Sequence, residues 1–161
     1  MDNREILTDV GETLDTYGKY TGLTSGYSMW PLLRHHKDNI IVIKNEGRLN
    51  KYDIALYRRP DGNYVLHRVT AVQPDSYTVT GDHCTYDETV TDGMICGVLA
   101  GFFRGGKRYV DCREGKAQRC YAKVWVALRP LRPLLLFAER CVRFIRRIIF
   151  RKQQDGQSIG E

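Results

Sequence analysis

The chain has 161 residues and a formal net charge of +6. A chain of this length forms one domain of ordinary size, which can bury a core without help from disulfide bonds. The charge is distributed unevenly, because residues 1–100 hold 10 basic and 14 acidic side chains whereas residues 101–161 hold 15 basic and 5 acidic ones. This asymmetry indicates that the C-terminal part meets an anionic surface, for which lipid headgroups and nucleic acid are both candidates.

The five cysteines are spaced irregularly and form no Cys-x-x-Cys pair. An odd number at such spacing argues against a disulfide framework and against a zinc ribbon. The pattern favours a reducing compartment, in which thiols stay free. The first twenty residues are acidic and contain no apolar run, so we expect neither a secretory signal nor an N-terminal membrane anchor.

The N-terminal segment has the periodicity of a short amphipathic helix. Four apolar residues share one helical face: Ile6, Leu7, Val10 and Leu14. This spacing predicts a helix over roughly residues 3–17, and Gly18 is expected to end it.

From Tyr20 to Cys112 the pattern changes to short runs that are typical of strands and are separated by turn residues. We expect strands over Ile40–Lys44, Ile54–Arg58, Tyr64–Val69, Ser76–Thr80, Ile95–Phe103 and Lys107–Cys112. The sequences Pro60-Asp61-Gly62-Asn63 and Arg104-Gly105-Gly106-Lys107 predict two hairpin turns. No helical pattern interrupts these runs, so the sequence predicts a compact, mainly antiparallel β-domain.

Three short motifs in this β-region carry side chains suited to nucleophilic catalysis. Ser28 lies in Gly26-Tyr27-Ser28-Met29-Trp30-Pro31, where turn-forming neighbours can hold its hydroxyl exposed. A serine becomes a useful nucleophile when a positioned base removes its proton, and a histidine such as His67 does this near neutral pH. Asp82 in the Gly81-Asp82 corner adds a carboxylate that can orient the imidazole. We therefore expect Ser28 Oγ within about 2.6–3.2 Å of a ring nitrogen of His67, or somewhat farther in the absence of substrate.

These motifs, Ser-x-Met-x-Pro at Ser28, His-Arg-Val at His67 and Gly-Asp at Asp82, resemble the sequence boxes of type I signal peptidases. That clan also contains the self-cleaving LexA-like repressors. A histidine in place of a lysine is similar to the archaeal and endoplasmic-reticulum branch. The segment 50–57 resembles the intervening box, with Tyr52 where the family usually has glycine. The likeness, which runs from about residue 22 to residue 98, implies the β-fold of the clan and a serine endopeptidase that needs no cofactor.

The resemblance also implies roles for further residues. In the histidine branch a second acid lies six residues after the aspartate, and here that position is Glu88. We expect Asp82 to be the essential structural acid, with Glu88 as its competitor for direct contact with the imidazole. The backbone N–H of Ser28 is expected to be one donor of the oxyanion hole. The family often supplies a hydroxyl two residues before the serine, where this chain has Gly26, and Ser25 is the nearest replacement. Loss of one such donor typically slows catalysis about 10²–10³-fold.

Alternation along the third predicted strand places Val65, His67 and Val69 on one face. Between two valines the imidazole loses water, which favours the neutral form that a general base needs. The alternative is a buried structural histidine that is hydrogen-bonded to the backbone. The serine and aspartate motifs at the family's spacing favour the catalytic role.

The adjacent His35 and His36 do not predict a metal site. Their side chains point in different directions, and only His83 or Cys84 offers a third ligand, whereas zinc sites need three or four convergent ligands. We expect neither a metal nor a cofactor.

After residue 119 a third pattern begins. Pro130 and Pro133 prevent one continuous helix, and beyond Leu134 apolar residues recur at helical spacing with arginines on the other face. These arginines exclude a membrane-spanning segment, which needs roughly 20 nearly uncharged residues. A basic amphipathic helix that lies in the headgroup region fits better than packing on the domain or on a second subunit, and nucleic acid fits least.

The sequence thus predicts four parts: an N-terminal helix (1–19), a signal-peptidase-like β-domain (20–118), a basic amphipathic segment (119–152) and a disordered tail (153–161). We expect a serine endopeptidase that uses Ser28, His67 and either Asp82 or Glu88 on an extended peptide or preprotein. We expect it in the cytoplasm, peripheral to the inner face of the cell membrane, and without a nucleic-acid partner. Two alternatives are a weak or inactive peptide-binding scaffold of the same fold and a LexA-like self-cleaving regulator.

Overall fold

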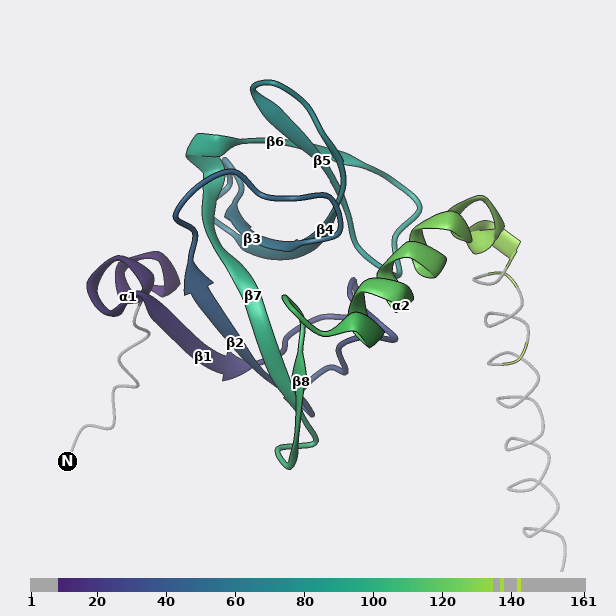
Figure 1. Ribbon diagram of the computed structural model, residues 1–161, viewed down its shortest axis with the longest axis horizontal. Coiled ribbons are helices and arrows are strands. Elements are labelled where there is room, and N and C mark those ends of the chain that lie inside the picture. Colours follow the sequence, from purple (N-terminus) through teal and green to yellow (C-terminus); the bar gives the residue numbers. More distant parts are fainter. Residues whose placement is uncertain (1–8, 135–136, 138–141, 143–161) are drawn as a thin grey trace, which may run out of the picture. The chain divides into compact units, whose positions relative to one another are not determined.

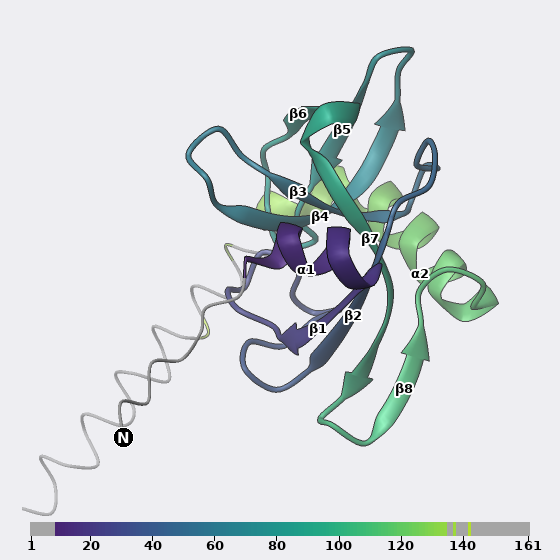
Figure 2. The same ribbon diagram turned by 90° about the vertical axis from the view of Figure 1, so that its left-hand side faces the viewer.

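The structure, a computed structural model, describes residues 9–134, 137 and 142. The chain forms two compact units, Met1–Ala127 and Leu128–Glu161. The described elements of the first unit are α1 (Val10–Tyr17), β1 (Lys19–Leu23), β2 (Asn39–Lys44), β3 (Ile54–Arg58), β4 (Tyr64–Val72), β5 (Ser76–Thr80), β6 (Glu88–Thr91), η1 (Asp92–Met94), β7 (Ile95–Arg104), β8 (Arg108–Asp111) and α2 (Lys116–Ala127). Figures 1 and 2 show α1 and α2 on opposite sides of the strands.

The strands form one antiparallel sheet with the order β1-β2-β7-β3-β4-β5-β6, and β8 pairs with β7. Strand β7 pairs along one edge with β2, and along its other edge with β3 and then with β8. The pairing register shifts where β7 pairs with β2 and with β3, and where β4 pairs with β5. Such bulges bend a strand and increase its twist. The predicted mainly antiparallel β-domain is confirmed.

Both faces of the sheet are buried, and β3 shows how. Ile54 and Leu56 belong to one core cluster, whereas Ala55 and Tyr57 belong to another, because successive side chains of a strand point to opposite faces. The first cluster also contains Leu14 of α1 and Met29 from the loop after β1. This core therefore anchors the loop that carries Ser28.

The predicted strands are confirmed to within three residues at each end, and both predicted hairpin turns are present. Gly62, Gly105 and Gly106 have φ values of 86°, 59° and 74°, a backbone region that glycine enters at no steric cost. Two strands, β1 and β6, were not predicted. Their pairing with β2 and β5 fixes them, since neither has a clear alternating pattern of its own.

Helix α1 ends at Tyr17 with Gly18 in the left-handed conformation, as predicted. At its other end Asp9 accepts hydrogen bonds from the backbone N–H groups of Gly11 and Glu12 and so caps the helix. The predicted start near residue 3 lies outside the described residues.

Helix α2 begins at Lys116 and belongs to the first unit, in which it packs on the β-domain. Trp125 Nε1 donates a 2.9 Å hydrogen bond to the backbone carbonyl of Asp82.

In the second unit the structure describes η2 (Arg129–Leu131) and helical residues 132–134, 137 and 142. The rest of the predicted amphipathic segment and the predicted tail lie outside the described residues. Within the described part of the chain, no helix is long and apolar enough to cross a membrane.

Candidate functional site

Ser28 and His67 line the same pocket of about 280 Å³, here called the serine pocket. Its walls come from two segments that are far apart in the sequence, the loop after β1 and the start of β4. Its lining residues are Thr24, Ser25, Gly26, Ser28, Met29, Leu33, Ile40, Arg59, Tyr64, Val65, Leu66, His67 and Tyr86. The fold thus brings the predicted nucleophile and the predicted base to one place.

The loop that carries Ser28 is held by its neighbours. Met29 is buried in the core, and the carbonyl oxygen of Ser28 accepts a 2.8 Å hydrogen bond from the backbone N–H of His83. Gly26 has a φ of 84°, which residues with a side chain rarely adopt. Its N–H donates to Nδ1 of His35 at 2.9 Å. The turn at Gly26 and the burial of Met29 together leave Ser28 half-buried on the pocket wall.

His67 is only 1% exposed within β4, where alternation puts it on the same face as Val65 and Val69 of the second core cluster. Burial lowers the pKa of His67 from its ordinary value of 6.5 to about 4, although the nearby charge of Glu88 acts in the opposite direction. The imidazole is therefore neutral at neutral pH, which is the state that a general base needs.

Tyr57 connects His67 to Glu88. Nδ1 of His67 lies 3.0 Å from the Tyr57 hydroxyl, and that hydroxyl donates to Oε2 of Glu88 at 2.9 Å. A hydroxyl has one proton, so Tyr57 accepts a hydrogen bond from His67 while it donates to the carboxylate. Burial raises the pKa of Tyr57 above its usual range, which keeps the phenol protonated. This network assigns the imidazole proton to Nδ1 and leaves the lone pair on Nε2.

Glu88, not Asp82, is the acid that reaches the imidazole. Its Oε1 lies 3.4 Å from Nδ1 of His67. Arg59 binds both carboxylate oxygens, with Nε 2.8 Å from Oε2 and Nη2 on Oε1. The hydrogen bonds from Arg59, and then that from Tyr57, hold the pKa of Glu88 below its usual range, so the carboxylate stays ionised. The sequence left both acids open, and the geometry places Glu88 in contact.

Asp82 instead fixes the corner after β5 to the strand that carries the base. Nε and Nη2 of Arg68 donate to its two carboxylate oxygens at 2.8 and 2.7 Å. Both side chains are buried, at 3% and 0% exposure. The Tyr121 hydroxyl adds a longer bond of 3.4 Å. Because Arg68 follows His67 on β4 and points to the opposite face, this ion pair connects the corner of Asp82 to the strand that carries His67.

Gly81 lies where the backbone of Ser28 and the ring of His67 come close to each other. A Cβ atom at this position would lie 2.6 Å from the carbonyl oxygen of Ser28 and 3.0 Å from Nε2 of His67. Among the described residues, however, the Ser28 hydroxyl forms no hydrogen bond with His67. The hydrogen-bonded arrangement expected from the sequence is therefore not observed. Such catalytic bonds are often long without substrate and shorten when it binds.

Donors for an oxyanion hole are present in part. The backbone N–H of Ser28 donates to no other described residue. Among the hydroxyls that line the serine pocket, that of Thr24 donates to the carbonyl of Arg34 at 2.5 Å, whereas Ser25 lies on the wall beside Ser28. The site therefore offers one backbone donor and Ser25 as a candidate for the second.

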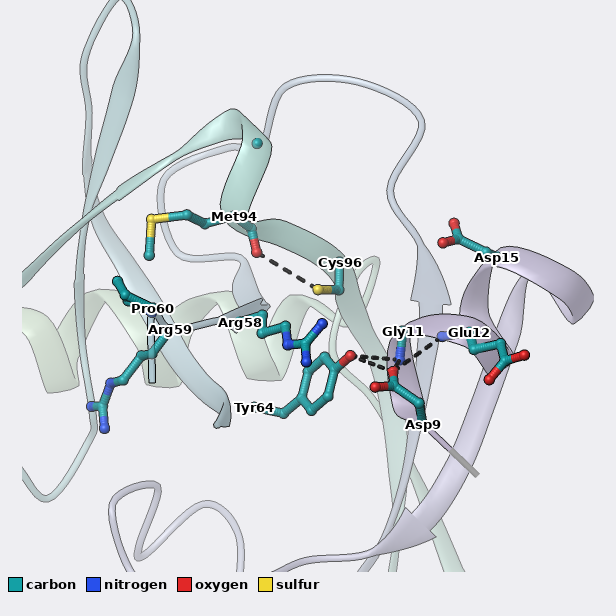
Figure 3. Close-up of a pocket in the computed structure, with 11 residues that line it drawn as sticks. Asp9, Gly11, Glu12, Asp15, Arg58, Arg59, Pro60, Tyr64, Met94 and Cys96 are labelled. Atoms are coloured by element: carbon teal, nitrogen blue, oxygen red, sulfur yellow. Dashed lines mark hydrogen bonds between the residues drawn. The ribbon is translucent and has the colours of Figure 1, made fainter. Parts of the chain in front are cut away.

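Tyr64 and Arg59 line both the serine pocket and a larger pocket of about 640 Å³ beside α1. Figure 3 shows the larger pocket, with Tyr64 next to the start of α1. The Tyr64 hydroxyl donates to the Asp9 carboxylate and accepts a 3.1 Å hydrogen bond from the N–H of Gly11. The guanidinium carbon of Arg58 lies 5.5 Å from the centre of its ring. These contacts attach the start of β4 to α1, so this wall of the serine pocket is fixed.

Sequence reasoning did not find Tyr57 or Arg59. One signal was available for Tyr57, because alternation along β3 puts it on the face that Ala55 shares with its cross-strand partner His67. Arg59 follows the strand and gave no signal. No group of three or more histidine, cysteine or acidic residues in the described part of the chain is placed to hold a metal ion.

No family model matches the chain, and comparisons with curated proteins and with solved structures found no match. Assignment of a function therefore depends on the residues and on their geometry.

Proposed function

We propose that this protein is a serine endopeptidase similar to the signal peptidases, with Ser28 as nucleophile and His67 as general base. One observation carries the proposal. The chain of contacts from Glu88 through Tyr57 to His67 leaves the lone pair on Nε2, and this nitrogen lies at the Gly81 corner against which the Ser28 backbone packs. A base oriented by a charged third group beside a serine is the arrangement that nucleophilic catalysis requires.

In the proposed reaction Ser28 Oγ attacks the carbonyl carbon of the peptide bond while Nε2 of His67 takes the hydroxyl proton. The same nitrogen gives that proton to the leaving amine as the C–N bond breaks. Water then attacks the acyl-serine ester, with His67 again as base, and releases the acid and free Ser28. The ionised Glu88 favours the imidazolium that forms in both steps, and no cofactor takes part.

The edge of β4 supports an extended peptide as the substrate. Strand β5 pairs with residues 68–72 only, so among the described strands residues 64–67 have β3 as their single neighbour. All four of these residues line the serine pocket, which places the edge of the strand against it. A peptide that adds to this edge gains main-chain hydrogen bonds and passes beside Ser28.

We place the enzyme in the cytoplasm, peripheral to the inner face of the cell membrane, where it would cut a peptide or preprotein. This location depends on the sequence of residues 101–161, whose 15 basic and 5 acidic side chains suit an anionic surface.

The alternative is a peptide-binding scaffold of the same fold with weak or no catalysis. Two observations favour it. No hydrogen bond joins the Ser28 and His67 side chains in the described residues, and a base with a pKa of about 4 is weaker than one poised near neutral pH.

A serine-directed fluorophosphonate probe separates the two functions. Intact mass should show one adduct on the wild type, none on Ser28→Ala, and an unchanged adduct on the control Ser76→Ala, whose hydroxyl bonds Gln73 on the surface. Tyr57→Phe and Glu88→Gln should slow labelling at least about tenfold, because general-base catalysis typically contributes 10²–10⁴-fold. A folded wild type that takes no label, or a label that persists in Ser28→Ala, refutes the peptidase and leaves the scaffold.

A further inference from the structure

The opposite face of β4 borders a second site of distinct chemistry. A pocket of about 310 Å³, here called the basic pocket, lies between the loop before β3 and helix α2. Four basic side chains that are not part of the serine pocket line it: Lys51, Arg113, Arg119 and Lys123. Arg68 also lines it, but its charge is balanced by Asp82.

Among the described residues, none of the four basic groups forms a salt bridge. Outside the lining, the carboxylate of Asp111 lies near Arg113. Hydrogen bonds from the backbone N–H groups of Glu114 and Arg113 lower the pKa of that carboxyl, and the charge of Arg113 helps to lower it further. Asp53 is the acid in the lining, and one of its carboxylate oxygens already accepts the backbone N–H of Asn50 at 2.8 Å. Four positive charges and one negative charge leave the pocket with a net charge of +3. Burial raises the pKa of the Cys112 thiol in the lining to about 12, so it adds no negative charge.

The walls of the basic pocket are held in place. Tyr52 has a φ of 81°, the region that favours glycine, and a bulky residue stays there only when its surroundings hold it. Its N–H donates to the carbonyl of Val69 at 2.8 Å, and its carbonyl accepts from Nη1 of Arg68 at 3.2 Å. On the facing wall, Arg119 Nε donates to the carbonyl of Arg113 at 3.2 Å. These contacts hold the walls around a space whose described lining has four unbalanced basic side chains and one carboxylate, that of Asp53.

We propose that the basic pocket binds a phosphate-bearing anion, independently of the peptidase activity. A phosphate monoester carries about −1.5 to −2 charges near neutral pH and three acceptor oxygens, which suits several cations better than one carboxylate does. Arginine presents the paired donors that phosphate oxygens accept. The volume lies at the lower end of small-molecule sites, so it admits a phosphate with a small carrier. The phosphate belongs either to a soluble ligand or to a lipid headgroup.

Calorimetric titration of the full chain with inorganic pyrophosphate at low salt tests the soluble source. We expect saturable binding that weakens at least about tenfold in Arg119→Ala/Lys123→Ala, since each lost charge-assisted hydrogen bond is a strong one. Lys116→Ala is the matched control, because it removes a charge from the same helix outside the pocket lining. All three proteins should have the same circular dichroism spectrum, because each substitution is at an exposed position.

Co-sedimentation with phosphatidylcholine vesicles that contain phosphatidic acid tests the lipid source. Every protein keeps its basic C-terminal segment, so a difference between the double variant and Lys116→Ala reports on the pocket alone. If the double variant binds pyrophosphate more weakly than Lys116→Ala, the ligand of the pocket is a soluble phosphate. If it binds more weakly to the vesicles but not to pyrophosphate, the ligand is a lipid headgroup. The proposal is overturned when the wild type binds neither probe, or when the double variant binds as well as Lys116→Ala in both assays.

Discussion

Gly81→Ala tests the geometry of the serine pocket most directly. The added Cβ would lie 2.6 Å from the carbonyl oxygen of Ser28, 2.7 Å from Cys84 Sγ and 3.0 Å from Nε2 of His67. The carbonyl cannot retreat easily, because it accepts the N–H of His83. Overpacking of this kind destabilises a protein by about 1–3 kcal/mol. We also expect fluorophosphonate labelling to slow by about 10²-fold, which is the usual effect of displacing a reacting group by about 1 Å.

Urea denaturation and the labelling rate measure the two effects. Gly47→Ala and Gly93→Ala are matched controls, since a Cβ at either position meets nothing within 4 Å and neither residue has a positive φ. Their free energies of unfolding should stay within about 0.5 kcal/mol of the wild type. If Gly81→Ala is as stable as these controls and is labelled at the wild-type rate, Ser28 and His67 are not packed around Gly81 as described.

Three further predictions concern the acids, the base and the C-terminal segment. Asp82→Asn should lower the free energy of unfolding by about 3–5 kcal/mol in urea, because it leaves Arg68 buried without a counter-charge, whereas Glu88→Gln should lower it by less than about 2 kcal/mol; equal losses would contradict their separate roles. The folded pKa of His67, about 4, lies below its ordinary value of 6.5, so the unfolded chain binds more protons between these values. The stabilisation from a neutral His67 is therefore complete above pH 6.5 and is lost as the pH falls toward 4. In urea denaturation, the free energy of unfolding of His67→Asn should depend less on pH than that of the wild type. Parallel curves for the two proteins would contradict the lowered pKa of His67. A chain that ends at Arg129 should lose salt-sensitive binding to phosphatidylserine vesicles, at about 1 kcal/mol per basic side chain removed, and keep the circular dichroism spectrum of the β-domain; equal vesicle binding by the shortened chain would make the segment ordinary packing.

Much of the fold could be predicted from local patterns. Ile54–Arg58 and Ser76–Thr80 agree with the structure at both ends, because β-favouring runs are bounded there by turn residues. Lys19–Leu23 has no such pattern, since it is an edge strand whose residues alternate only between exposed and half-buried. Pairing with β2 makes it a strand, and pairing of that kind is not visible in five residues of sequence.

The sequence motifs predicted which residues lie close together in the site, but not which side chains contact each other. Ser28 and His67 share a pocket as the motifs indicated. Whether Asp82 or Glu88 reaches the imidazole depends on the register of β5 with β6, in which Val79 lies opposite Glu88. A shift of one residue would have turned the carboxylate to the other face. Tyr57 was missed for a similar reason, since its role appears only when β3 and β4 are paired.

Because side chains alternate between the two faces of β4, insertions and deletions in the β3–β4 hairpin are restricted. His67 and Arg68 are adjacent, yet one serves the serine pocket and the other holds Asp82 and borders the basic pocket. One residue inserted into or deleted from the β3–β4 hairpin, if the strand slipped to accommodate it, would exchange the two side chains between the faces. A slip in one direction would put Arg68 at the position of His67 in the serine pocket and leave Val69 facing Asp82. A slip in the other direction would put Leu66 at the position of His67 and replace the counter-charge of Asp82 with a histidine. In the turn at residues 59–63, natural variants should therefore differ mainly by substitution. A change in the length of the turn should be tolerated only when Ala55 stays opposite His67.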